Sequence, residues 1–316
     1  MMKDHTHPIS YSAIIPVYNS EQIVGMTIDR TVAFFESQQW TYEIILVNDG
    51  SPDNSWQIIQ KKAKENPSII AINLLKNYGQ HTALYCGLQQ SCGKYMITLD
   101  DDLQNPPEEI IHLVTKAEEG HDLVFGRFRK KEHGSYRRWG TRVIGSMNEK
   151  IFNKPDELVL TNFRLLERDV VDRICSYKTN YPYIPGLALM FATNPANVWV
   201  EHKKRPIGDS NYNSFKIAEL VMRILFNYSS YPLRFVSFFG LIIALFSFLL
   251  GIYYFMRAVF IGTLVPGWAT LVILLSFFNG TSLLMLSMLG EYIIRLLNQM
   301  SSTNSYYIKD IVQSDE

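Results

Sequence analysis

Three consecutive aspartates carry the clearest chemistry in this sequence. Asp100, Asp101 and Asp102 directly follow a largely apolar run over residues 95–99. Such a run without alternation is typical of a strand buried on both faces, as in a parallel α/β sheet. Open sheets of this kind bind ligands at the carboxyl ends of their strands. Because side chains alternate along an extended chain, Asp100 and Asp102 are expected to converge while Asp101 points away.

Two carboxylates separated by one residue, with the amide oxygen of Gln104 nearby, form a set of hard oxygen donors. Mg²⁺ and Mn²⁺ prefer such ligands, especially when a diphosphate completes the coordination. A solvated acidic turn is the alternative for a lone Asp-x-Asp. Three adjacent acids need compensation for their mutual repulsion. We therefore predict a metal site at Asp100, Asp102 and Gln104.

The segments around these aspartates alternate between strand and helix patterns. Strands are predicted at 11–17, 43–47, 69–74, 95–99 and 122–125. Helices are predicted over 21–38, between the second and third strands as far as 64, between the third and fourth strands as far as 90, and from Pro106, with Asn105 as the N-cap of the last. This order predicts right-handed βαβ crossovers and a parallel sheet. The sequence contains neither Gly-x-Gly-x-x-Gly nor a Walker A motif. A metal and cationic side chains would therefore have to hold phosphates.

Composition excludes several classes of function. Thirty basic and thirty acidic residues cancel, so no overall charge favours a nucleic-acid partner. The three cysteines show no Cys-x-x-Cys spacing and predict neither a zinc site nor a disulfide framework. The first ten residues are polar and lack the apolar core of a signal peptide.

Two uncharged stretches, 235–256 and 268–290, are each long enough to cross a bilayer. A buried helical hairpin is the alternative. Basic residues flank the pair on both sides and Arg257 alone lies between them, which places both flanks in the cytoplasm. We predict a catalytic domain over 1–213, an interfacial amphipathic helix region over 214–233, two transmembrane helices within 234–291 (about 235–257 and 266–290), and a juxtamembrane helix and tail over 292–316. The amphipathic helix could instead be buried in the soluble domain.

A basic segment lies between the acidic motif and the apolar stretches. Seven basic residues fall within 127–142. A solvated charged face is the usual meaning of such a run. Its position favours a groove for an anionic headgroup, because arginine binds phosphate through two parallel hydrogen bonds.

Four motifs together resemble a known family. They are IPVYN at 15–19, VNDGS at 47–51, NYGQH at 77–81 and LDDDLQNPPE at 99–108. They resemble the family 2 glycosyltransferases with a GT-A fold, a Rossmann-like α/β nucleotide-diphospho-sugar transferase domain, followed here by two transmembrane helices. The resemblance is closer to the polyprenyl-phosphate glycosyltransferases, which include dolichyl-phosphate mannose synthases, bactoprenol glucosyltransferases and undecaprenyl-phosphate aminoarabinose transferases. It covers essentially the whole chain.

The resemblance implies an activity and a location. It implies inverting, metal-dependent transfer of a sugar from a nucleotide-sugar, with a UDP-sugar first among donors, to undecaprenyl phosphate for cell-envelope glycans such as lipopolysaccharide. The metal would be Mg²⁺ or Mn²⁺. The protein would lie in the bacterial inner membrane, in contact with membrane lipid, with its catalytic domain in the cytoplasm and as a homo-oligomer such as a tetramer.

The resemblance also assigns roles to particular residues. The nucleotide-sugar would contact Pro16, Tyr18, Glu21, Asp49, Asp100 and Asp101. The lipid phosphate would contact Arg127, Arg138, Arg142, Arg205, Ser210 and Tyr212. The catalytic set would be Asp100, Asp102, Asn162 and Arg164.

The sequence departs from the family pattern at three asparagines, Asn48, Asn162 and Asn211. Asn162 stands where some relatives carry the aspartate of Gly-Asp-Phe-Arg-Leu, a proposed base. A phosphomonoester has a second pKa near ~6, so the lipid phosphate is already an ionised nucleophile at neutral pH. Asn162 could then position an oxygen while Arg164 holds the anion, and we expect activity to survive.

Two other functions remain open at the level of the sequence. A polysaccharide synthase or a transferase acting on another lipid is one, although SYRRW at 135–139 lacks the glutamine of the processive Gln-x-x-Arg-Trp motif. A catalytically silent membrane binding protein is the other, and the intact Asp100, Asp102 and Gln104 set argues against it. The identity of the sugar stays open.

Overall fold

The computed structural model describes residues 9–128, 145, 147–179, 181–203, 214–229, 232, individual helical positions between 235 and 260, 267–300 and 305–314. The chain forms two compact units, one of residues 1–217 with 304–316 and one of residues 218–303. The first unit contains the strands and most of the helices: β1 (Tyr11–Val17), α1 (Val24–Ser37), β2 (Tyr42–Asn48), α2 (Ser55–Glu65), β3 (Ile69–Leu74), α3 (Gln80–Gln90), β4 (Tyr95–Thr98), η1 (Pro107–Glu109), α4 (Ile110–Glu118), β5 (Leu123–Phe128), β6 (Arg164–Glu167), α6 (Arg168–Ser176), α7 (Ile184–Phe191), β7 (Pro195–Val200) and β8 (Ile308–Val312).

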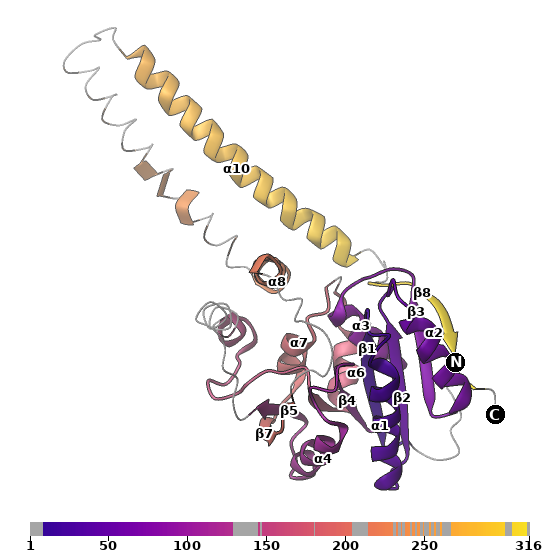
Figure 1. Cartoon of the computed structure of the whole chain (residues 1–316). Helices are drawn as coiled ribbons and strands as arrows, with labels where there is room; N and C mark the ends of the chain where they lie inside the picture. The colour runs from indigo at the N-terminus through magenta and orange to yellow at the C-terminus, as the bar shows by residue number, and fades with distance from the viewer. Residues whose placement is uncertain are drawn as a thin grey trace. The chain divides into compact units, whose positions relative to one another are not determined.

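The described strands form one eight-stranded sheet in the order β7-β5-β6-β4-β1-β2-β3-β8 (Figure 1). The β1–β2, β1–β4, β2–β3 and β5–β7 pairs are parallel. The sheet is nevertheless mixed, because β6 runs antiparallel to both β4 and β5, and β8 runs antiparallel to β3. The five predicted strands all run in the same direction, which confirms the parallel arrangement predicted for them, and β6 and β8, two strands that were not predicted, make the sheet mixed.

Side-chain alternation explains the helices on both faces of the sheet. On one face Ile15 and Leu46 belong to a core shared with apolar side chains of α1, α2 and α4. On the other face α3 approaches so closely that a Cβ on Gly87 would lie 2.4 Å from the Ile14 side chain. Both faces are covered, so the parallel strands are buried at nearly every position.

The helix predicted from Pro106 begins differently from the expectation. A 3₁₀ turn, η1, precedes α4, and no side chain caps either of them. Asn105 is buried, and its Oδ1 lies 3.3 Å from Nδ1 of His202. The expected N-cap therefore binds another segment of the chain.

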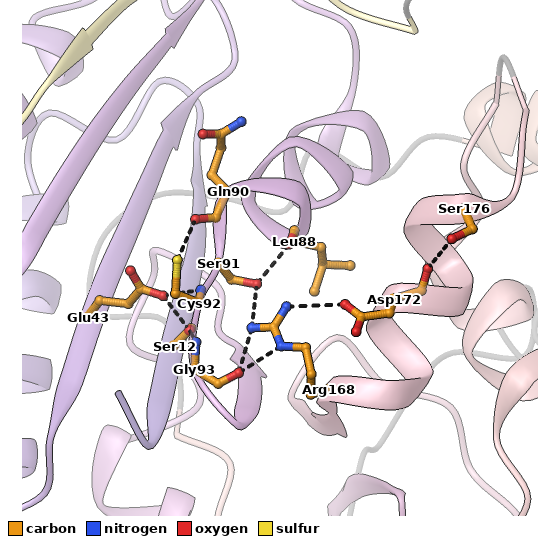
Figure 2. Close-up of polar contacts among 10 residues, drawn as sticks. All are labelled: Ser12, Glu43, Leu88, Gln90, Ser91, Cys92, Gly93, Arg168, Asp172 and Ser176. Carbon is orange, nitrogen blue, oxygen red and sulfur yellow. Dashed lines mark hydrogen bonds and ion pairs between the residues drawn. The ribbon is translucent and has the colours of Figure 1, made fainter. Parts of the chain in front are cut away.

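A buried polar network fastens the amino ends of the strands (Figure 2). Glu43 accepts hydrogen bonds from Ser12 Oγ and from the backbone N–H of Cys92, both at 2.6 Å. Ser12 Oγ in turn accepts from the Gly93 N–H at 2.8 Å, and Arg168 Nε donates to the Gly93 carbonyl at 3.0 Å. The network ties β1, β2, the entry to β4 and the exit from β6 together at the edge opposite the aspartates.

The C-terminal residues add the last strand to the sheet. β8 pairs antiparallel with β3, with Asn73 opposite Asp310, and Figure 1 shows it beside β3. Val312 packs partly buried against the core. The strand lies within residues 292–316, for which the sequence predicts a juxtamembrane helix and tail and no strand.

The second unit contains α10 (Trp268–Met300) and most of α8 (Ser214–Tyr228). The first four residues of α8 belong to the first unit. The α10 helix runs without a break for 33 residues. Among the residues that the model describes, no helix combines the length and the apolar character needed to cross a membrane. Much of the predicted 235–257 span and the connector after it lie outside the described residues.

Candidate active site

The site lies where the carboxyl ends of β1, β2 and β4 meet the amino end of β6. Because β4 and β6 are antiparallel, Thr98 at the end of β4 pairs with Arg164 at the start of β6. This register brings Asn162, just before β6, beside Asp100, just after β4. The direction of β6 is therefore what assembles the two halves of the site.

Asp100 is held from two sides. Its Oδ1 accepts a hydrogen bond from Gln80 Nε2 at 2.8 Å and one from Asn162 Nδ2 at 3.4 Å. Burial raises the pKa of Asp100 to about 6, and the neighbouring Asp102 carboxylate adds to the increase, while the positive charge of Arg164 acts against it. The two carboxylates thus lie close enough to repel, in a setting that favours a bound cation.

Arg164 places a buried positive charge near this carboxylate. Its side chain is 0% exposed. Nε donates to Thr98 Oγ1 at 3.1 Å, and Nη2 lies 3.5 Å from Asn162 Oδ1. Among the described residues Nη1 has no hydrogen-bond partner. The Asn162 amide therefore joins a buried cation to Asp100, with its oxygen toward Arg164 and its nitrogen toward the carboxylate.

His81 lies next to this cluster, at the start of α3. Its ring meets those of Tyr181 and Tyr183 edge to face, with centroids 6.5 and 5.2 Å away. Burial, together with the positive charge of Arg164, lowers the pKa of His81 to about 3. The imidazole is therefore neutral at physiological pH.

Asp101 faces the loop that follows β1. Its Oδ2 accepts hydrogen bonds from the Tyr18 N–H at 3.3 Å and from the Ser20 hydroxyl. The Asp101 carbonyl accepts from Thr27 Oγ1 on α1 at 2.8 Å. Burial raises the pKa of Asp101 to about 6, against the effect of the Ser20 hydrogen bond. Asp101 thus joins the loop between β4 and η1 (residues 99–106), called here the aspartate loop, to the β1–α1 loop.

The rest of the aspartate loop is fixed by its own backbone and by the segment after β7. The Gln104 N–H donates to Asp102 Oδ1 at 3.0 Å, and the Gln104 carbonyl accepts from the Lys203 N–H at 2.9 Å. Leu103 adopts a positive φ of 56°, a conformation that side chains rarely adopt and that tight functional loops often contain. The loop is therefore held in a defined shape with Asp100 and Asp102 near each other.

Asp49, at the end of β2, binds backbone rather than side chains. Its Oδ1 accepts from the Tyr78 N–H at 2.7 Å and its Oδ2 from the Gly79 N–H at 2.9 Å. Burial raises the pKa of Asp49, and these two hydrogen bonds oppose the rise. The carboxylate therefore fixes the loop between β3 and α3 at the same edge of the sheet as the aspartates.

The other residues assigned to the nucleotide-sugar occupy different settings. Pro16 is buried within β1, and Tyr18 is 48% exposed just beyond that strand. Glu21 Oε2 accepts hydrogen bonds from the backbone and side-chain nitrogens of Asn54, both at 3.0 Å. Glu21 thus holds the amino end of α2, while Tyr18 is more accessible than Pro16.

Arg127 is the one lipid-phosphate candidate within the described residues. It lies in β5 with its guanidinium 4.6 Å from the centre of the Trp199 ring, in line with the parallel register of β5 and β7. The other candidates lie outside the described residues: Arg138, Arg142, Arg205, Ser210 and Tyr212.

Sequence reasoning did not assign roles to several residues of this site. Gln80 contacts Asp100, Ser20 contacts Asp101, and Thr98 contacts Arg164. Gln80 lies inside the NYGQH motif, which was a usable signal. Ser20 and Thr98 carry no such signal, because a serine after a strand or a threonine within one is common on any α/β scaffold.

The donor set fits a hard divalent cation. Asp100 and Asp102 supply adjacent carboxylates, and Gln104 follows on the same constrained loop. No group of three or more His, Cys, Asp or Glu side chains in metal-binding geometry occurs in the part of the chain that the model describes. Two carboxylates and an amide would leave coordination positions for ligand oxygens, as Mg²⁺ and Mn²⁺ sites often do.

The fold and the acidic site at the carboxyl ends of its strands fit a glycosyltransferase, and comparison with known proteins supplies the family. Residues 12–175 match the model of glycosyl transferase family 2, which is just over half of the chain. The chain therefore belongs to glycosyl transferase family 2. The matched region runs from β1 almost to the end of α6. It includes Asp100, Asp101, Asp102, Asn162 and Arg164.

Relatives extend over nearly the whole chain. The undecaprenyl-phosphate 4-deoxy-4-formamido-L-arabinose transferase of Proteus mirabilis is 36% identical over 95% of this chain and 93% of its own length. The protein of the same name from Yersinia enterocolitica is 36% identical over 96% of this chain and 94% of its own length. Coverage this complete means that the similarity extends well beyond the family 2 region.

Solved structures share the fold over 69% of the chain. Glucosyl-3-phosphoglycerate synthase from Mycobacterium tuberculosis, in complex with phosphoglyceric acid, superposes with a TM-score of 0.51 at 14% identity and covers 69% of this chain and 77% of that chain. The same enzyme with Mn²⁺, UDP and glucosyl-3-phosphoglycerate gives a TM-score of 0.50 at 16% identity, with the same coverage. At this level of identity the similarity establishes the GT-A fold.

Proposed function

We propose that this protein transfers a sugar from a nucleotide-sugar to undecaprenyl phosphate. The observation that carries the proposal is the cluster at the β4–β6 junction, where Asp100, Asn162 and Arg164 form one connected unit. Membership of family 2 and the names of full-length relatives support it. The product would be a sugar joined to the lipid through a single phosphate.

The donor would bind across the carboxyl edge of the sheet. The nucleotide would lie against the loops after β1 and β2. These loops carry Tyr18 and Asp49, and Asp101 binds the Tyr18 N–H. Asp100, Asp102 and Gln104 would hold Mg²⁺ or Mn²⁺ against the diphosphate. When bound, the metal would act as a Lewis acid that neutralises charge on the leaving group. A similar fold in complex with Mn²⁺ and UDP supports this arrangement.

The acceptor phosphate would supply the nucleophile without a protein base. A phosphate oxygen would form a bond to the anomeric carbon as the bond to the nucleoside diphosphate breaks, and the leaving group would take the electron pair. Attack from the opposite side inverts the anomeric carbon. Asn162 accepts from Arg164 and donates to Asp100, so its role would be to align these groups rather than to remove a proton.

Arg164 would act through charge. Because its guanidinium is fully buried, it would stabilise Asp100 and Asn162 from below the site rather than meet the lipid at an open surface. Placing fixed charges before the reaction accounts for much of the rate enhancement in many enzymes. Direct contact with lipid phosphate is assigned to Arg127 and to the basic residues outside the described part of the chain.

Residues 235–257 and 266–290 would anchor the protein in the bacterial inner membrane, with the catalytic unit in the cytoplasm. Both stretches are uncharged over most of their length, and described side chains of α10 such as Leu271, Leu283 and Leu286 are more than half exposed. Exposed apolar side chains of this density favour contact with lipid. A lipid phosphate could then reach the site without leaving the bilayer.

The sugar proposed is 4-deoxy-4-formamido-L-arabinose, because that is the sugar in the names of the relatives. The test uses detergent-solubilised full-length protein, undecaprenyl phosphate and separate UDP-sugars, including UDP-4-deoxy-4-formamido-L-arabinose, UDP-glucose and UDP-N-acetylglucosamine. Mass spectrometry would identify the lipid product, with Mg²⁺, with Mn²⁺ and with EDTA. A metal-dependent glycosyl-phosphoryl lipid from the arabinose donor is expected. Absence of any lipid product from every donor would contradict the proposal.

A further inference from the structure

The C-terminal tail makes more contacts with the catalytic unit than strand pairing alone requires. Before β8 begins, Ser305 Oγ donates to the Thr179 carbonyl at 2.8 Å. Tyr306 then donates through its hydroxyl to Gln89 Oε1 of α3 at 2.6 Å and also hydrogen-bonds with Cys86. The tail is thus fastened to α3 as well as to β3.

A further contact of the tail reaches the loop between β3 and α3, which consists of residues 75–79 and is called here the 75–79 loop. The Leu75 N–H, at the start of the loop, donates to the Tyr307 carbonyl at 2.9 Å. At the other end of the loop, the N–H groups of Tyr78 and Gly79 donate to Asp49. The loop is therefore held by the tail at one end and by Asp49 at the other.

The 75–79 loop packs closely against Gly50 and therefore cannot move toward it. Gly50 has a positive φ of 62°, and a Cβ there would lie 2.6 Å from the backbone of Lys76 and Asn77. The loop backbone thus packs directly on the Asp49–Gly50 turn. Any displacement of the loop would alter the surroundings of Asp49.

A second line of contacts connects the tail to the same turn. Asp310 Oδ2 accepts from Asn73 Nδ2 at 3.3 Å, and Asn73 Oδ1 accepts from Asn48 Nδ2 at 2.8 Å. Asn48 immediately precedes Asp49, and both Asn48 and Asn73 are buried. The tail therefore contacts the end of β3 directly through Asp310, the end of β2 indirectly through Asn73, and the 75–79 loop through its backbone.

From these contacts we infer that β8 and the residues leading into it are a positioning element of the nucleotide site. The docked tail holds the 75–79 loop where it fixes Asp49, so nucleotide affinity depends on a segment that does not itself touch the nucleotide. This inference rests on the proposed function, because it takes Asp49 as a donor-binding residue. Its effect falls on donor binding and not on the chemical step.

The adjacent tyrosines provide a matched pair of variants. Tyr306→Ala removes the side chain whose hydroxyl contacts Gln89 and Cys86. Tyr307→Ala removes a side chain that is 52% exposed and leaves its backbone carbonyl in place. Tyr306→Phe keeps the ring without the hydroxyl. A chain lacking residues 305–316 serves as a second variant in which docking is impossible.

Docking of the tail can be measured separately from nucleotide binding. Cys86 is buried, its thiol interacts with Tyr306, and burial raises the pKa of the thiol to about 12, so alkylation of Cys86 should be slow in the parent. In a Cys92→Ser, Cys175→Ser background, Tyr306→Ala should accelerate alkylation of Cys86. Hydrogen exchange in peptides spanning residues 75–79 should increase in the same variant.

Nucleotide affinity is then measured by titrating each detergent-solubilised protein with UDP and Mn²⁺. Tyr306→Ala and the tail deletion should raise Kd by about tenfold, with Tyr306→Phe in between and Tyr307→Ala within about twofold of the parent. With the sugar donor, KM should rise while kcat at saturating donor stays within about twofold.

An unchanged Kd in the tail deletion, or in a Tyr306→Ala protein whose Cys86 has become reactive, would overturn the inference and leave the proposed function intact. A loss of kcat at saturating donor with unchanged KM would also overturn it. If the parent bound no UDP even with Mn²⁺, the nucleotide-sugar proposal would fall, and this inference would fall with it.

Discussion

Asn162 and Asp100 lie 3.4 Å apart, with the amide nitrogen of the first donating to a carboxylate oxygen of the second. The amide oxygen of Asn162 faces Arg164 at 3.5 Å. An aspartate at position 162 would lose the donor and set a second negative charge against Asp100. The site is therefore built around an amide at this position.

The first prediction follows from that contact. Asn162→Asp should not increase turnover at neutral pH, because the acceptor phosphate is already ionised and needs no base. Asn162→Leu should lower kcat by at least about tenfold, because it removes the group that joins Arg164 to Asp100. Steady-state assays of both variants test this. A clear gain in kcat for Asn162→Asp would show that a base limits the native enzyme.

The second prediction concerns the metal. Asp102→Asn should reduce turnover by at least about 100-fold and weaken Mn²⁺ binding, because it removes a hard anionic ligand. Electron paramagnetic resonance of free Mn²⁺ measures binding without reference to activity. Asp156→Asn, at an exposed carboxylate, is the matched control and should change neither quantity. Normal Mn²⁺ affinity in Asp102→Asn would contradict the assignment.

The third prediction concerns pH and His81. The folded-state pKa of His81 is about 3, below the ordinary value near 6.5, so the unfolded chain binds the proton more readily. The stability from this residue is present above pH 6.5 and is lost as pH falls toward 3, by about 2 kcal/mol at pH 5. Thermal unfolding at pH 7 and 5 should show a smaller loss in His81→Phe than in the parent. His112→Phe, at a more exposed histidine, should behave like the parent.

The fourth prediction concerns the network in Figure 2. Ser12→Ala should destabilise the catalytic unit by about 1–3 kcal/mol, because Glu43 and the Gly93 N–H both lose a buried partner. Donor KM and kcat should stay within about twofold, since the network lies at the opposite ends of the strands. Ser37→Ala removes one local hydrogen bond and should cost less. Equal losses of stability in the two variants would contradict the assigned importance of the network.

The central strands were predictable because their signals are local. The apolar runs at 11–17 and 69–74 matched β1 and β3 at both ends, and those at 43–47 and 95–99 differed from β2 and β4 by no more than one residue at either end. Long apolar runs bounded by turn residues have few alternative structures. The aspartates could be placed at the end of β4 for the same reason.

The two antiparallel strands were not predictable from local signals. β6 has four residues and β8 has five, and neither shows a pattern that sets its direction. The contacts of Asn162 with Asp100 depend on β6 and are therefore tertiary. The resemblance pointed to Asn162 and Arg164, but the buried position of Arg164 emerged from the fold alone.

The strand at the edge of the sheet also determines when the catalytic unit can finish folding. Asn73 and Asp310 are 237 positions apart in sequence, and the whole second unit is synthesised between them. Until β8 has left the ribosome, β3 presents an unpaired edge of the kind that invites association with other chains. The helical segments are therefore an insertion into the catalytic sheet, and the sheet can close only after those segments have been made.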